Sequence, residues 1–280
     1  MNVDESKGCA RVSVETSAPV EVAFDALVQS DKLGSWLGTP TTALRGRGVT
    51  RIEFGDGDFF AVEGIELEPP TRLRYVWRFL GLGAKNLITW TVTPEGSRTV
   101  IRVTDEQPER DDREVEMMCE GWRDFLDRLA RYLATGESAR YDWRRDLDGG
   151  VELPLGVDQA AASLFTPEAL DRWQPWRASS WISGARLVVS DGEQPAKLRL
   201  AEVDCRSTEL RFTIAAPEWR QATRCELALS PRSDGSMLTF RHTGWDQIDP
   251  RDQVQRDQRK RFCRLWITSL LRARAYTGTP

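Results

Sequence analysis

The chain has 280 residues, of which 40% are hydrophobic and 29% charged, and its formal net charge is −4 at pH 7. The composition is typical of a folded soluble protein, and the length favours two domains. The slightly negative net charge argues against a nucleic-acid-binding surface. The five cysteines form no C-x-x-C pair, no apolar run approaches the roughly 18 residues of a membrane span, and residues 1–12 lack an apolar signal core. We therefore expect a cytoplasmic protein that binds neither nucleic acid nor a membrane.

The first half of the chain predicts an α+β arrangement. A short strand is expected at residues 11–16, and Pro19 then suits the first turn of a helix. This helix breaks, and a second short helix ends near Trp36. Several antiparallel strands follow, because apolar and polar residues alternate between turn signals such as PEGS (94–97). A long helix closes the unit, since apolar residues recur at i, i+3, i+4 and i+7 over residues 115–133.

The same order of elements recurs 137 positions later. At this offset VEVAFDALVQSDKLGSW (20–36) aligns with VDQAAASLFTPEALDRW (157–173), and TRLRY (71–75) aligns with TELRF (208–212). Two copies of one domain explain this agreement better than chance.

A drift of two residues between the copies is expected further along the chain. It aligns GSRTVIRVT (96–104) with GSMLTFRHT (235–243), because both segments begin with Gly-Ser. This alignment places Val103 opposite His242.

The duplication predicts two tandem domains, at residues 10–136 and 151–278. The segment between them, 137–150, is polar and ends in two glycines, so we interpret it as a linker. The second copy is expected to open with a strand at 151–155. Each copy should fold as a curved antiparallel sheet wrapped around its long C-terminal helix, since every element has one apolar face to bury.

This order of elements resembles the START superfamily, also called the helix-grip or SRPBCC fold. The first copy is similar in particular to the group related to the C-terminal domain of the heat-shock-protein-90 ATPase activator. The resemblance is carried by SAPVEVAFDALVQSDKLGSWLG (17–38), GIELEPPTRLRYVW (64–77) and GWRDFLDRLARYL (121–133). The second copy is more divergent: it keeps FRHTGW (240–245) but has lost the proline pair.

The resemblance implies a cavity between the sheet and the long helix that holds a hydrophobic compound such as a lipid, a sterol or a polyketide. Some members of the superfamily act as polyketide cyclases. A tandem pair without the N-terminal domain of true chaperone activators also resembles bacterial self-resistance proteins from enediyne antibiotic clusters. Those proteins bind the drug, and some are cleaved by its radical in place of DNA.

Bulky side chains supply the candidate ligand-binding residues. Tyr75, Trp77 and Phe79 alternate along one strand and therefore share a face. Packing in the core is the simpler interpretation for any one aromatic residue, whereas the group together favours a cavity. The predicted ligand-binding set is Trp36, Tyr75, Trp77, Phe79, Met118, Trp122, Phe125, Trp173, Phe212, Phe240, His242 and Trp266.

Catalytic groups are few. The single histidine, His242, would have to serve any Ser-His-Asp triad or Cys/His zinc site, and no phosphate- or dinucleotide-binding glycine motif is present. His242 could act as the base of a cyclase, but a neutral histidine that is hydrogen-bonded in the core is the simpler interpretation. The carboxylates Asp105, Glu106, Glu63 and Glu53 would serve only if buried, and charges on strands usually face solvent. We predict no catalytic residue, no metal site and no cofactor.

The function predicted first is non-enzymatic binding of a hydrophobic polycyclic or polyketide-type small molecule. Enediyne self-resistance, by sequestration or self-sacrifice, would be its role. A polyketide cyclase or aromatase is the first alternative, and it requires an acid or base inside the pocket. A chaperone-interaction module, acting through its outer surface, is the second.

Overall fold

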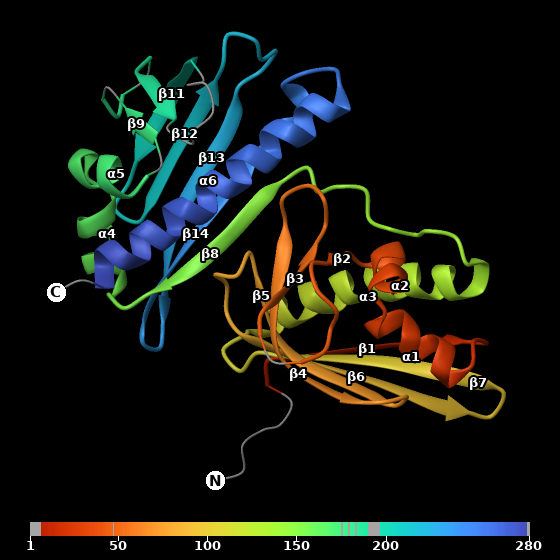
Figure 1. Ribbon diagram of the computed structural model, residues 1–280. Helices are drawn as coiled ribbons and strands as arrows, with labels where there is room; N and C mark the ends of the chain where they lie inside the picture. Colours follow the sequence, from red (N-terminus) through yellow and green to blue (C-terminus); the bar gives the residue numbers. More distant parts are fainter. Residues whose placement is uncertain are drawn as a thin grey trace. The chain divides into compact units, whose positions relative to one another are not determined.

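The chain divides into two compact units, Met1–Asp142 (unit 1) and Trp143–Pro280 (unit 2), drawn in Figure 1. This computed structural model describes residues 7–46, 48–174, 176–178, 180–182, 184–189 and 197–278. The division falls inside the segment interpreted as a linker.

Unit 1 is a seven-stranded antiparallel sheet with strand order β1-β7-β6-β5-β4-β3-β2. The long helix α3 lies across one face of this sheet (Figure 1). In chain order the elements are β1 (Cys9–Thr16), α1 (Val20–Val28), α2 (Ser30–Trp36), β2 (Thr39–Pro40), β3 (Thr50–Glu53), β4 (Phe59–Glu68), β5 (Arg72–Phe79), β6 (Asn86–Glu95), β7 (Arg98–Glu106) and α3 (Asp112–Thr135).

Unit 2 repeats this plan, with strand order β8-β14-β13-β12-β11-β10-β9 and the long helix α6. Its elements are β8 (Leu147–Leu153), α4 (Val157–Leu164), α5 (Pro167–Trp173), β9 (Trp176–Ala178), β10 (Arg186–Val189), β11 (Lys197–Cys205), β12 (Glu209–Ala215), β13 (Thr223–Arg232), β14 (Gly235–Thr243), the 3₁₀ helix η1 (Trp245–Gln247) and α6 (Asp252–Gly278). The predicted fold, two helix-grip domains in tandem, is confirmed.

Local sequence signals define the helix ends. The Asp111 side chain accepts from the Glu114 backbone N–H, and the Glu114 side chain accepts from the Asp111 N–H, so a capping box starts α3. Gly136 ends α3 in the left-handed region, with φ at 71°. Thr166 caps α5 ahead of Pro167, its first residue.

The predicted drift of two residues between the copies is wrong. In unit 1 the turn joins Glu95 to Arg98, and in unit 2 it joins Arg232 to Gly235, so the offset of 137 continues through both hairpins. The shared Gly-Ser pair is misleading, because it forms the turn in unit 1 and opens the strand in unit 2. Asp105, not Val103, is therefore the counterpart of His242.

The second unit also begins earlier than the sequence predicts. Strand β8 starts at Leu147 and includes both Gly149 and Gly150, which pair with β14. A Cβ on Gly150 would lie 3.0 Å from the Leu238 carbonyl oxygen and 3.2 Å from the Met237 sulfur. These glycines permit close packing inside a sheet and do not form a flexible joint.

Candidate functional site

The aromatic candidates of unit 1 come together in its core. Trp77 stacks on Trp122 with ring centroids 4.9 Å apart and on Phe60 at 3.8 Å. Trp122 contacts Trp90 edge-on, and Trp90 contacts Trp36 in the same way. Because Trp36, Trp77 and Trp122 are at most 1% exposed, these rings fill the space beneath α3 with one another.

The other unit 1 candidates border this cluster. Tyr75 is buried and accepts a hydrogen bond from the Trp90 indole N–H at 3.1 Å. Phe79, Met118 and Phe125 are half-buried. The Trp77 indole N–H is buried and has no hydrogen-bond partner among the described residues.

In unit 2 the structure brings Phe240, His242 and Trp266 together. Phe240 stacks on Trp266 at 4.7 Å, and the His242 ring lies 6.1 Å from the Trp266 ring. Phe212 is buried on β12 and contacts Trp176, which in turn contacts Trp266.

Trp36 and Trp173 have the same structural role in the two units. The Trp36 indole N–H donates to the carbonyl of Ala26 at 2.9 Å, and that of Trp173 donates to the carbonyl of Leu164 at 3.0 Å. Each of these carbonyls lies in the last turn of the preceding helix and has no hydrogen-bond donor within that helix. The indole N–H supplies the missing hydrogen bond. Both side chains are fully buried.

His242 is held as a neutral imidazole. Its Nδ1 accepts from the Trp266 indole N–H at 3.0 Å, and its Nε2 lies 2.8 Å from the Thr223 hydroxyl oxygen. An indole nitrogen can only donate, so Nδ1 carries no proton and Nε2–H donates to Thr223. Burial, aided by the charge of Arg259, holds the pKa of His242 well below its usual range.

Asp105 occupies the equivalent position in unit 1. Its Oδ2 accepts from the Trp122 indole N–H at 2.9 Å, and its Oδ1 pairs with the Arg110 guanidinium at 3.0 Å. Burial raises the pKa of Asp105, and the Arg110 charge and the Trp122 hydrogen bond oppose this rise. The other strand carboxylates behave as expected: Glu53 and Glu106 are exposed, and Glu63 lies 3.4 Å from Lys85.

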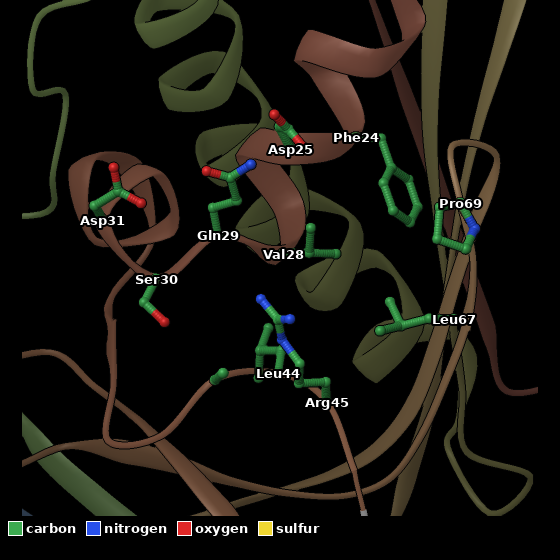
Figure 2. Close-up of a pocket in the computed structure, with 11 residues that line it drawn as sticks. Phe24, Asp25, Val28, Gln29, Ser30, Asp31, Leu44, Arg45, Leu67 and Pro69 are labelled. Carbon is green, nitrogen blue, oxygen red and sulfur yellow. The ribbon is translucent and has the colours of Figure 1, made fainter.

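A pocket of about 440 Å³ opens in unit 1 at a different place (Figure 2). It lies between the C-terminal end of α1 and the start of α2, the loop that joins β2 to β3, and the turn between β4 and β5. The lining residues are Phe24, Asp25, Val28, Gln29, Ser30, Asp31, Ala43, Leu44, Arg45, Leu67 and Pro69. None of the twelve predicted residues lines it, so their contact with a ligand stays a prediction.

The pocket is divided into an apolar side and a polar side. Figure 2 shows Phe24, Leu67 and Pro69 on one side, and Gln29 and Asp31 on the other. Phe24 also belongs to the hydrophobic core of unit 1, so the apolar side is continuous with the aromatic cluster. The sequence offers one signal for this site, an apolar-basic pair, Leu44-Arg45, in a loop between two short strands.

Charges in the pocket are partly neutralised. Asp25 pairs with Lys32 at 2.8 Å, and this hydrogen bond lowers the pKa of Asp25. Arg45 forms no ion pair with any carboxylate in the described part of the chain.

The described residues also bear on metal binding and on membrane crossing. They contain no group of three or more His, Cys, Asp or Glu side chains placed to hold a metal ion. No helix among them is both long and apolar enough to cross a bilayer.

Comparison with known proteins identifies the family. Residues 17–134 match the Activator of Hsp90 ATPase homolog 1-like proteins. DynU16, described as a putative protein in the dynemicin biosynthetic locus, is 31% identical, with 96% of this chain and 98% of that chain covered and a TM-score of 0.81. No curated protein sequence matches the chain.

Two further solved structures share less with the chain. The di-domain ARO/CYC protein StfQ from the steffimycin biosynthetic pathway is 14% identical, with 95% of this chain and 97% of that chain covered and a TM-score of 0.39. CalU16 from Micromonospora echinospora is 19% identical, with 46% and 77% covered and a TM-score of 0.38. The agreement with DynU16 along almost the whole length, together with the match of residues 17–134, shows that the chain belongs to the Activator of Hsp90 ATPase homolog 1-like family of helix-grip proteins as a two-domain member.

Proposed function

We propose that unit 1 binds a hydrophobic polycyclic compound of the polyketide type in the pocket of Figure 2. The observation that carries this proposal is the pocket itself. Its volume of about 440 Å³ falls in the range of roughly 300–1,000 Å³ that is typical of small-molecule sites. The description of DynU16 as a protein from the dynemicin locus supports a product of such a pathway as the ligand.

Burial of apolar surface against the apolar side of the pocket favours binding. Each 100 Å² of apolar surface that a ligand buries contributes about 2.5 kcal/mol, at about 25 cal/mol per Å². Loss of translational and rotational freedom offsets part of this gain. Non-covalent binding of this kind requires no catalytic step.

Neither His242 nor Asp105 is available as the acid or base of a cyclase. His242 uses one ring nitrogen for Trp266 and the other for Thr223. Asp105 uses its oxygens for Trp122 and Arg110. A general acid or base must reach the substrate, and neither group lines the pocket. The role that fits best is sequestration of an antibiotic, as a form of self-resistance.

Two variants of helix α1 test the proposed pocket. Val28 lines the pocket, whereas Val22, on the same helix, is 46% exposed and lies outside it. We expect Val28→Trp to fill the pocket and weaken binding of an anthraquinone or a dynemicin-type enediyne at least tenfold, and Val22→Trp to leave the dissociation constant unchanged.

Binding is measured by two-dimensional NMR titration, with thermal unfolding as the test that each variant is folded. Saturable shifts around α1 and residues 43–45 are expected for the unaltered protein. Absence of binding at several hundred micromolar ligand, or equal affinity of Val28→Trp, would contradict the proposal. Intact mass after exposure to the enediyne distinguishes sequestration from self-sacrifice, since only the second cleaves the chain.

A further inference from the structure

We propose that Arg45 makes the pocket selective for acidic ligands, which carry a carboxylate or a phenolate at one edge of an apolar ring system. This inference rests on the proposed function and names the chemical class of its ligand. Arg45 lies on the loop between β2 and β3 and lines the pocket. Figure 2 shows its guanidinium next to Leu44 and directed toward Val28 on α1.

The charges around Arg45 leave its guanidinium available. Its backbone N–H donates to the Ala43 carbonyl at 2.7 Å, but its side chain has no ion-pair or hydrogen-bond partner in the part of the chain that the structure describes. Asp25 is already paired with Lys32. Side-chain hydrogen bonds with Lys32 and Gln29 lower the pKa of Asp25 and so favour its ionised form. Lys32 is thus neutralised, and Arg45, which is exposed to solvent, is not. The second acid that lines the pocket, Asp31, forms no ion pair with Arg45 in the described part of the chain.

The arrangement suits a ligand with two distinct ends. The rings would lie against Phe24, Leu67 and Pro69, which form the apolar side in Figure 2. An acidic group at the other end would reach Arg45, whose planar guanidinium can donate two parallel hydrogen bonds to a carboxylate. A neutral ligand of the same shape would keep the apolar contacts and lose these charge-assisted bonds.

The test compares three anthraquinones of similar size: the 2-carboxylate, the 2-carboxamide and the 2-aminomethyl derivative. The dissociation constants are measured by calorimetry on the full chain, for the unaltered protein and for Arg45→Gln, Arg45→Lys and Arg113→Gln. Arg113 is exposed on α3 and does not line the pocket, so it is the matched control.

We expect the unaltered protein and Arg113→Gln to bind the carboxylate about tenfold more tightly than the carboxamide, as a charge-assisted hydrogen bond predicts. Arg45→Gln should remove this preference and leave carboxamide binding within about twofold, because the apolar contacts remain. Arg45→Lys should keep part of the preference, since lysine retains the charge but not the paired donors.

A second readout uses a hydroxyanthraquinone whose colour reports ionisation of its phenol. Binding to the unaltered protein should move this transition to lower pH, because Arg45 stabilises the phenolate, and Arg45→Gln should abolish the shift. Equal binding of carboxylate and carboxamide, tighter binding of the amine, or a preference that survives in Arg45→Gln would overturn the role of Arg45 and leave the pocket intact. Failure of all three ligands to bind would overturn the pocket as well.

Discussion

The two units place different acceptors at one structural position. In each, a tryptophan of the long helix donates its indole N–H to the eighth residue of the last strand: Trp122 to Asp105, and Trp266 to His242. The carboxylate requires a buried cation, Arg110, whereas the neutral imidazole requires only a hydroxyl partner. The donor is common to both units and the acceptor differs, so this position serves to anchor the helix on the sheet. Chemistry at this position would require a free acid or base, and neither unit provides one.

The largest effect is expected from Asp105→Ala. Arg110 is 5% exposed, and without the carboxylate its charge stays buried without an ion-pair partner, while the Trp122 N–H loses its acceptor. Breaking a buried ion pair in this way costs about 3–5 kcal/mol. Urea unfolding, with hydrogen exchange of β7 and α3 amides, measures the loss in unit 1.

The neighbouring Glu106→Ala is the control, because Glu106 is exposed and its removal should change the free energy of unfolding by less than about 0.5 kcal/mol. If Asp105→Ala cost no more than this control, the anchoring role in unit 1 would be refuted.

The next largest effect is expected in the stability of unit 2 at acidic pH. The native pKa of His242 lies well below its unfolded value of about 6.5, so below that pH the unfolded chain binds a proton that the folded chain does not. Unit 2 should therefore be most stable above about pH 6.5 and lose up to about 1.4 kcal/mol per pH unit as the pH falls below it. Urea unfolding between pH 7.5 and about 5 gives this slope.

The chain has one histidine, so His242→Gln removes this contribution entirely. The free energy of unfolding of this variant should not show the histidine-dependent decrease as the pH falls, whatever its absolute value. An identical slope in the variant would mean that His242 is not buried as a neutral ring.

The smallest effect is expected from Thr223→Val. The change removes the hydroxyl that partners His242 Nε2 and leaves the Trp266 hydrogen bond in place. A single buried hydrogen bond predicts a loss of about 1 kcal/mol in unit 2. Thr239→Val, an exposed position on β14, should cost less than about 0.5 kcal/mol, and nitrogen NMR of the His242 ring should show a change only in the first variant.

The fold could be predicted from the sequence because its signals are local. Strand alternation, the broken front helix and the long apolar helix each follow from residues close together in the chain. The sequence predictions were wrong where glycine-containing segments have a structure other than the expected one. Gly-Ser forms a turn at 96–97 and opens a strand at 235–236, and Gly149-Gly150 lies within β8.

The interior chemistry depended on contacts that the sequence does not reveal. Asp105 stands on a strand where charges usually face solvent, and it is buried because Arg110, in the following loop, folds back onto it. The pocket likewise combines α1, residues 43–45 and the β4–β5 turn, which are distant in sequence. Aromatic residues can be recognised from the sequence, but whether they stack on one another or leave space depends on their packing.

Each unit completes its own sheet, since all seven strands of either sheet come from one half of the chain. Among the described residues, no strand of one half pairs with a strand of the other half. A substitution that weakens the strand pairing in one unit therefore leaves the strand pairing of the other unit intact. The carboxylate in one unit and the imidazole in the other, each accepting from a tryptophan of the long helix, are compatible with this independence.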